Sequence, residues 1–337
     1  MRVPQAKPSR IRQSLAIRRR IALFTHRADA IQRHRWVHRS FTVFLAFAIP
    51  ILSMASFSLL SAQPASASGI IASGVSCKSS TFCMGVDDEG DALAYDGTTW
   101  SITSIDSGNA FRGVSCASST FCVAVDNVGN AFKYNGSSWS SSDIDGTTQI
   151  DAVSCTGSSF CVAVDPDGNA LKYNGTSWSS SDIDGTTQIN TVSCTGSSFC
   201  VAVDIDGNAL KYNGTSWSSS DIDGTNELDS LSCVSASFCE AGDGLGNILH
   251  YNGTSWSSSS ISSVPVFGVS CTSSSFCQAV DDNGNAIIYN GSVWDTPSAT
   301  DASSLLAISC PKSDFCAAGD NNGNALIFTN WSAATAI

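Results

Sequence analysis

Short apolar stretches alternate with small polar turns along the chain from Val75 onward, and the segment between residues 151 and 178 shows the pattern most clearly. Residues 151–155 alternate between polar and apolar side chains, which is typical of a half-buried strand. Residues 160–164 are almost continuously apolar, which indicates a strand that is covered on both faces. Residues 170–173 and a segment that begins at Trp178 complete a prediction of four short strands.

The segments between these strands have the composition of turns. Residues 156–159 form a small polar turn, and a second turn begins at Asp165, where Gly168 supplies the positive φ angle that it requires. Asn174-Gly175 is the sequence signal of a tight hairpin. The strands are therefore expected to follow one another as hairpins, and residues 68–337 carry no helix signals.

The same pattern recurs seven times along the chain. The repeats start near residues 75, 114, 153, 192, 231, 269 and 308, which is a spacing of 39 residues with one step of 38. A period of this size with strand-like content is typical of one propeller blade per repeat. One such sheet alone could not bury both faces, so the sheets must pack against one another around an axis. We therefore predict an all-β fold, a seven-bladed β-propeller with four short antiparallel strands per blade.

The ring is expected to close between the first repeat and the last. Val75 already belongs to the innermost strand of the first repeat, and Trp331 begins only a short outer strand in the last. Exchange of a strand across this seam is not evident, although residues 69–74 could contribute one.

All 14 cysteines lie in the repeats, two in each, with five residues between the two. The pairs are Cys77 with Cys83, Cys116 with Cys122, Cys155 with Cys161, Cys194 with Cys200, Cys233 with Cys239, Cys271 with Cys277, and Cys310 with Cys316. An even count at fixed spacing predicts seven local disulfides, each across the first hairpin of its blade. Zinc is disfavoured, because this spacing exceeds that of zinc knuckles and His250 is the only histidine in the repeats. Redox-active dithiols would need an activating base or helix terminus that the sequence lacks.

Residues 1–67 differ in composition from the repeats and predict an export signal. Eleven of the 17 lysines and arginines lie in this segment, followed by an apolar run at residues 41–60 and by Ala65-Ser66-Ala67, a signal-peptidase type of site. An uncleaved membrane anchor is the alternative, because the apolar run is almost long enough to span a bilayer. Residues 68–337 are then the propeller, secreted or held at the cell surface.

Residues 68–337 hold 6 lysines or arginines against 28 aspartates or glutamates, a net charge of about −22. Such a surface repels nucleic acid, because nucleic-acid binding depends on neutralising phosphates with basic side chains. The expected partners are a glycan or another cell-surface component, with membrane contact only through an uncleaved N-terminal segment. We expect a monomer.

Part of each repeat resembles a known family. Val162-Ala163-Val164-Asp165, Gly168-Asn169-Ala170-Leu171-Lys172-Tyr173-Asn174-Gly175 and Trp178 resemble the tectonin repeat of lectin-like propellers. The resemblance covers the second half of every unit, and it implies a propeller that binds glycans on microbial or host surfaces. Tectonin repeats usually carry a tryptophan where this chain has Val162, and they lack the paired cysteines. The Cys-paired form also resembles repeats in secreted bacterial surface proteins.

Four residue types recur once per blade and are the candidate ligand-binding residues. In the second, third and fourth repeats they are Asp126, Asn130, Tyr134 and Trp139; Asp165, Asn169, Tyr173 and Trp178; and Asp204, Asn208, Tyr212 and Trp217. The aromatic residues are suited to stacking on sugar rings, and the alternative is that they pack neighbouring blades together. The aspartates open the turns and can accept hydrogen bonds from turn amides. Calcium at these turns, helped by Glu89, Asp167, Asp206 and Asp282, is disfavoured because several turns have too few carboxylates.

The sequence argues against catalysis. Within residues 68–337, His250 is the only histidine available as an acid or base and Arg112 is the only arginine, whereas sialidase-type propellers need an arginine cluster. A hydrolase would need unlike residues such as Arg112, Glu227, Glu240 and His250 to meet at one mouth of the channel. Near-identical blades instead build equivalent sites, which suits a multivalent, non-catalytic binding module. We predict lectin-like carbohydrate binding in the grooves between blades. The alternative is a structural or protein-interaction scaffold, with patches confined to one face of the ring.

Overall fold

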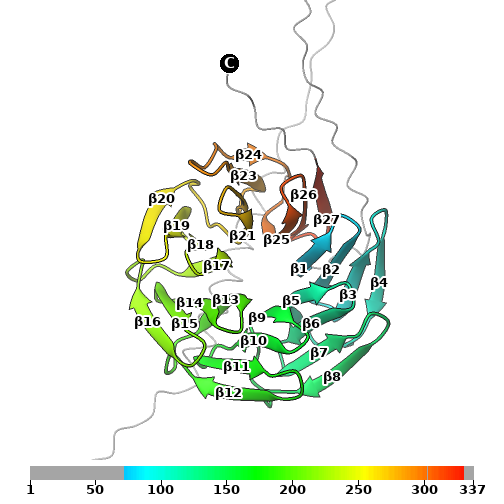
Figure 1. Cartoon of the computed structure of the whole chain (residues 1–337). Coiled ribbons are helices and arrows are strands. Elements are labelled where there is room, and N and C mark those ends of the chain that lie inside the picture. The colour runs from blue at the N-terminus through cyan, green and yellow to red at the C-terminus, as the bar shows by residue number, and fades with distance from the viewer. Residues whose placement is uncertain (1–71, 302, 330–337) are drawn as a thin grey trace, which may run out of the picture. The chain divides into compact units, whose positions relative to one another are not determined.

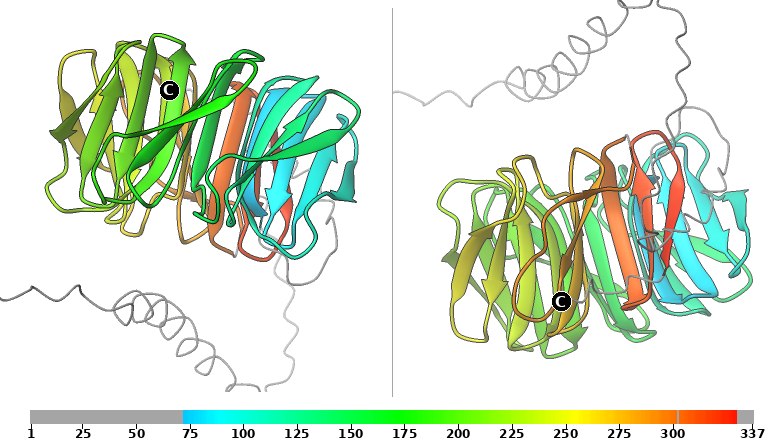
Figure 2. Two further views of the ribbon diagram at one scale, coloured as in Figure 1. Left: turned by 90° about the horizontal axis from the view of Figure 1, so that it is seen from below. Right: turned by 90° about the horizontal axis from the view of Figure 1, so that it is seen from above.

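The repeats fold into antiparallel sheets arranged as the blades of a ring (Figure 1). The computed structural model describes residues 72–301 and 303–329, so the predicted export signal and Trp331 lie outside the described residues. Figure 1 looks along the ring axis, with the first strand of each sheet at the centre and the last at the rim, and Figure 2 shows the blades from the side. The predicted seven-bladed propeller is confirmed.

The blades follow one another in chain order. Blade 1 has β1 (Ala72–Ser79), β2 (Phe82–Asp87), β3 (Asp91–Tyr95) and β4 (Trp100–Ser104); blade 2 has β5 (Phe111–Ser118), β6 (Phe121–Asp126), β7 (Asn130–Tyr134) and β8 (Trp139–Asp143). Blade 3 has β9 (Ala152–Gly157), β10 (Phe160–Val164), β11 (Asn169–Tyr173) and β12 (Trp178–Asp182); blade 4 has β13 (Ile189–Gly196), β14 (Phe199–Asp204), β15 (Asn208–Tyr212) and β16 (Trp217–Asp221). Blade 5 has β17 (Leu228–Ser235), β18 (Phe238–Asp243), β19 (Asn247–Tyr251) and β20 (Trp256–Ser260); blade 6 has β21 (Gly268–Ser273), β22 (Phe276–Val280), β23 (Asn285–Tyr289) and β24 (Ser298–Ala299). Blade 7 has β25 (Leu305–Lys312), β26 (Phe315–Asp320) and β27 (Ala325–Thr329) within the described residues.

Burial differs between the strands of a blade as the apolar pattern predicts. In β10 the residues from Cys161 to Val164 are at most 1% exposed, because neighbouring blades cover both faces of the sheet. The outer strand β12 follows Trp178 with serines and an aspartate that are exposed to solvent. Polar side chains on this edge strand discourage pairing with another chain. None of the described residues forms a helix long and apolar enough to cross a membrane.

The hydrophobic core is divided among the junctions between blades. The described residues contain seven clusters of buried side chains, and each cluster joins two neighbouring blades. Between blades 3 and 4, for example, Val162 and Val164 pack with Ile189 and Leu210. Full burial of a side chain of this size contributes about 1.5–3 kcal/mol. A blade is therefore stabilised by its neighbours rather than by a core of its own.

Each blade carries one disulfide between its first two strands, as predicted. In blade 3, Cys155 and Cys161 lie opposite each other in the register of β9 and β10, and their Cα atoms are 4.1 Å apart. Each bridge closes a short loop, for which the chain-entropy model gives about 2 kcal/mol. Disulfides at this density indicate an oxidising, extracytoplasmic environment.

A ring of hydrogen bonds joins the inner strands. The serine before the first cysteine of each blade accepts a hydrogen bond at Oγ from the backbone N–H of the equivalent cysteine in the next blade, at 2.9–3.0 Å. The last of these bonds runs from Cys77 N–H to Ser309 Oγ and closes the ring. Tyr95 also stacks on Phe315 across this seam. Within the described residues every sheet takes its strands from one continuous segment, so the seam closes through side chains and not through an exchanged strand.

The Asn-Gly hairpin is longer than the sequence signal suggests. Tyr173 pairs with Trp178, which leaves a loop of four residues that begins with Asn174-Gly175. The Asn174 side-chain oxygen accepts hydrogen bonds from the backbone N–H groups of Thr176 and Ser177. Gly175 has φ of 96°, a conformation that favours glycine. The predicted hairpin is present, and the asparagine side chain organises its four-residue loop.

Candidate functional site

The predicted aspartates and asparagines lie inside the turns. The carboxylates of Asp126, Asp165 and Asp204 are fully buried. In blade 3, Asp165 Oδ1 accepts hydrogen bonds from the backbone N–H groups of Asp167 (3.0 Å) and Asn169 (2.7 Å), and Asp165 Oδ2 accepts one from Asn169 Nδ2 (2.7 Å). Asp126 with Asn130, and Asp204 with Asn208, repeat this arrangement. These contacts give the turn residues a structural role, and their binding of a ligand stays a prediction.

The structure offers little support for calcium at the turns. The described residues contain no group of three or more histidines, cysteines, aspartates or glutamates placed to hold a metal ion. The oxygens that a cation would need are already occupied by amide donors, as at Asp165.

The predicted aromatic residues pair within each blade. Ring centroids are 5.2 Å apart for Tyr134 and Trp139, 5.2 Å for Tyr173 and Trp178, and 5.1 Å for Tyr212 and Trp217. The tyrosines of blades 3 and 4 are buried, and the tryptophans are only half-buried. A tryptophan therefore packs on its own blade and also presents part of its ring to the space between blades.

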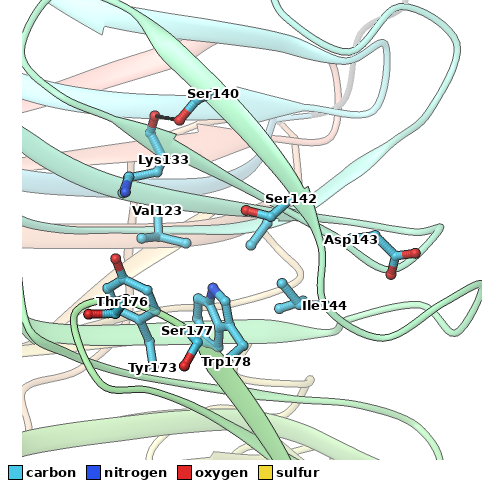
Figure 3. A pocket seen from close by; sticks show the side chains of 11 residues that line it. Val123, Lys133, Ser140, Ser142, Asp143, Ile144, Tyr173, Thr176, Ser177 and Trp178 are labelled. Atoms are coloured by element: carbon cyan, nitrogen blue, oxygen red, sulfur yellow. Dashed lines mark hydrogen bonds between the residues drawn. The ribbon is translucent and has the colours of Figure 1, made fainter.

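One groove opens between blades 2 and 3 and has a volume of about 390 Å³. Figure 3 shows Tyr173 and Trp178 on one wall, with Lys133 and Ser142 across from them. The Lys133 ammonium lies 5.9 Å from the centre of the Tyr173 ring, within the range of a cation–π contact. The next two junctions repeat this contact at 5.8 Å, for Lys172 with Tyr212 and Lys211 with Tyr251.

The equivalent groove between blades 5 and 6 has a volume of about 500 Å³ and a different lining. Glu240 and His250 stand where the first groove has Val123 and Lys133, and Tyr289 and Trp294 form the aromatic wall. His250 Nδ1 lies 2.8 Å from Glu240 Oε1.

Burial determines the charge of this pair. Glu240 is 1% exposed, and its desolvation raises its pKa to about 8. Burial also lowers the pKa of His250. Both shifts favour the neutral forms, so near pH 7 the pair is a hydrogen bond between a carboxylic acid and an imidazole rather than an ion pair.

A second carboxylate meets the turn aspartate at four junctions. Asp106, Asp145, Asp184 and Asp223 lie within hydrogen-bonding reach of Asp126, Asp165, Asp204 and Asp243 of the following blade. Desolvation and the neighbouring carboxylate raise the pKa of Asp145 to about 7. The buried Asp145 Oδ2 has no other partner, so a proton shared with Asp165 satisfies both groups. At the blade 5–6 junction Ser262 takes this place, and its hydroxyl donates to Asp281 Oδ2 at 2.8 Å.

Unlike side chains gather at the beginnings of four inner strands. We call the following chain of hydrogen-bonded residues the polar arc: Arg112, Gln149, Asp151, Gln188, Asn190 and Glu227. Arg112 donates to Gln149, whose amide nitrogen donates to Asp151.

The arc continues from blade 3 to blade 5. Gln188 Nε2 donates to Asp151 at 3.3 Å and to Asn190 at 3.1 Å, and Asn190 Nδ2 donates to Glu227 at 3.2 Å. Burial raises the pKa of Asp151 to about 6. The arc therefore crosses three junctions, and one of its repeat positions changes from Arg112 to Asp151 to Asn190 in successive blades.

The four residues considered for a hydrolase do not form one cluster. Glu240 and His250 share the blade 5–6 groove, whose lining includes neither Arg112 nor Glu227. Arg112 and Glu227 lie at opposite ends of the polar arc. The structure thus separates the four residues into two different places.

Sequence reasoning missed four members of the polar arc, Gln149, Asp151, Gln188 and Asn190, and two sets of residues that recur between blades. The serines that bond to the next blade have a plain signal, because a serine precedes the first cysteine in all seven repeats. The second carboxylate of each acidic pair also recurs, as the Asp of Ile-Asp in four repeats. Its partner lies in the next blade, and the pairing becomes visible only once the blades are placed side by side.

Comparison with known proteins relates this chain to others by fold. No protein-family model and no curated protein matches the sequence. Among solved structures, "YCF48 bound to D1 peptide" matches with a TM-score of 0.65 and 15% identity, over 78% of this chain and 94% of that chain. "YCF48 from Cyanidioschyzon merolae" matches with a TM-score of 0.63 and 14% identity, over 78% and 96%. The finer resemblance to tectonin repeats stays a prediction, and what these similarities show is that the chain has the β-propeller fold of Ycf48.

Proposed function

We propose that this protein is a non-catalytic binding module whose partner is a basic peptide segment of another protein. The polar arc is the observation that carries the proposal. Ser–Cys bonds and turn aspartates repeat in every blade and hold the ring together, whereas one position of the arc holds Arg112, Asp151 and Asn190 in three successive blades. A site made of unlike residues at one end of the inner strands suits one asymmetric partner better than seven equal ligands.

The charge of the arc favours a basic partner. Asp151 and Glu227 supply carboxylates against one guanidinium from Arg112, on a chain whose residues 68–337 carry about −22. Opposite charge steers association and disfavours wrong partners. A propeller of the same fold, Ycf48, has been seen with a peptide, which supports a peptide as the class of partner.

Selection of displayed peptides on the full chain tests this proposal. We expect enriched peptides to contain Lys or Arg, and we expect Asp151→Asn combined with Glu227→Gln to weaken them about tenfold or more, because two carboxylates are removed. Trp178→Ala, which alters a groove and leaves the arc intact, is the matched control and should bind normally. Failure to enrich any peptide over a scrambled library, or loss of binding in Trp178→Ala alone, would contradict the proposal.

Glycan binding in the grooves is the second candidate. The blade 2–3 groove favours it, because the partly exposed Trp178 ring stands beside hydroxyl groups such as Ser140 and Ser142. An aromatic face with nearby polar groups suits a sugar ring. A glycan array probed with the full chain and with Trp178→Ala tests this candidate. A signal that is lost in Trp178→Ala and kept in the double variant Asp151→Asn with Glu227→Gln would support glycan binding. The absence of any signal above background would rule it out.

A further inference from the structure

The blade 5–6 junction lacks the internal cation that three other junctions possess. In those three, a lysine of one blade places its ammonium 5.8–5.9 Å from the tyrosine ring of the next. At the blade 5–6 junction the equivalent ring is Tyr289, and the residue in the lysine position is His250. The imidazole is turned toward Glu240 by its hydrogen bond, and among the described residues no lysine ammonium covers the Tyr289 ring.

The same junction also contains a buried carboxyl group where the blade 2–3 junction has a valine. Val123 is the cross-strand neighbour of Lys133 in blade 2, and Glu240 is the cross-strand neighbour of His250 in blade 5. Glu240 Oε1 contacts His250, whereas the buried Glu240 Oε2 has no hydrogen-bond partner. A buried polar atom without a partner is unfavourable, and this one belongs to a residue that lines a groove of about 500 Å³.

We propose that the blade 5–6 groove binds a primary alkylammonium group, with its cation between the Tyr289 ring and Glu240 Oε2, where other junctions hold their own lysine. A free amine and the side chain of a lysine on another protein share this chemistry. The groove offers Ile248, Trp294 and Pro297 to the alkyl chain. No lysine or arginine is among the residues that line it. This inference stands apart from the polar arc and does not depend on the peptide partner proposed there.

Binding is coupled to one proton. The titratable groups that line the groove beside Glu240 are His250, Tyr289 and Asp295. Before binding, Glu240 is protonated near pH 7, because burial raises its pKa to about 8. The ammonium stabilises the carboxylate, so Glu240 releases its proton to solvent while His250 keeps the hydrogen bond by donating from Nδ1. Affinity for an amine that remains protonated therefore increases as pH rises from 6 to about 8 and then levels off.

Titration of the full chain with n-butylammonium, followed by the Trp294 fluorescence and by calorimetry, tests the site. We expect saturable binding that strengthens about tenfold or more between pH 6 and 8, and no binding of the neutral isostere n-butanol. A lysine-containing peptide and its norleucine counterpart form a second arm, which separates a protein side chain from a free amine as the source of the ammonium.

Two variants decide the outcome. Glu240→Gln keeps the shape of the side chain and removes its charge, and we expect it to weaken n-butylammonium about tenfold or more and to abolish the pH dependence. The double variant Glu240→Val with His250→Lys recreates the blade 2–3 pair and fills the site with its own ammonium, so it should not bind. Circular dichroism confirms the fold of both. Equal affinity in the wild type and in either folded variant, or affinity independent of pH, would overturn the proposal.

Discussion

The groove between blades 2 and 3 and the groove between blades 5 and 6 share the same backbone framework, but their lining side chains have opposite chemistry. Both grooves lie over a buried apolar cluster, and a tyrosine and a tryptophan of the following blade line one wall of each. Several lining residues differ between them, and the largest change in chemistry is one cross-strand pair, which is Val123 with Lys133 in the first and Glu240 with His250 in the second. At this register position one groove holds a lysine ammonium and the other a buried carboxyl group.

Truncation of one buried side chain beneath each groove tests whether the two junctions are packed in the same way. Leu171 and Ile287 are fully buried and occupy equivalent positions beneath the two grooves. We expect Leu171→Ala and Ile287→Ala each to lower the free energy of unfolding by about 2–5 kcal/mol, since each leaves a cavity. Urea denaturation measures both values. A cost confined to one variant would mean that the two junctions are packed differently.

Glu240 should make the stability of the fold depend on pH. Burial raises the pKa of Glu240 to about 8, above its value in the unfolded chain, so the folded state holds this proton more tightly. Its stabilising effect is complete below about pH 4.5 and is lost as pH rises toward 8. We expect Glu240→Gln to remove the loss of stability between pH 7 and 8, as measured by Tm at intervals of pH. An unchanged Tm profile would contradict this assignment.

The pairs of aspartates between blades, such as Asp145 with Asp165, should change the stability of the fold over a lower pH range than Glu240 does. Burial and the neighbouring carboxylate raise the pKa of Asp145 to about 7, so the stability that it contributes declines from about pH 4 to 7. Asp145→Ser copies Ser262 of the blade 5–6 junction, whose hydroxyl donates to Asp281. We expect this variant to gain about 1 kcal/mol at pH 8, since it replaces a repelled carboxylate by a hydrogen-bond donor. The alternative Asp145→Ala lacks the donor and should not reproduce the gain.

The smallest effect should come from the lysine that covers a ring. Lys133→Met keeps most of the aliphatic length and removes the cation above Tyr173. We expect a loss of about 0.5–1 kcal/mol in denaturant unfolding, the size of an exposed cation–π contact. Lys312→Met, which removes an exposed pairing with Asp314, is the control and should have a smaller effect.

The fold could be predicted because each blade repeats the same local signals. The apolar run of β10, the paired cysteines and the Asp-to-Asn turn each depend on residues close together in the sequence. The groove chemistry could not be predicted in this way. Glu240 and His250 are ten residues apart in the sequence and face the ring of Tyr289, which belongs to the next blade. A pattern that averages over repeats hides the positions that vary between blades, and the pair Glu240 with His250 occupies one of them.

The hydrogen bond from Cys77 to Ser309 matches the six other bonds between inner strands in kind and in length. In these bonds the seam does not differ from the six other junctions. A circular permutant, opened in another loop and joined across this seam, would form every one of the same contacts. Order along the polypeptide and position around the circle are independent in this architecture.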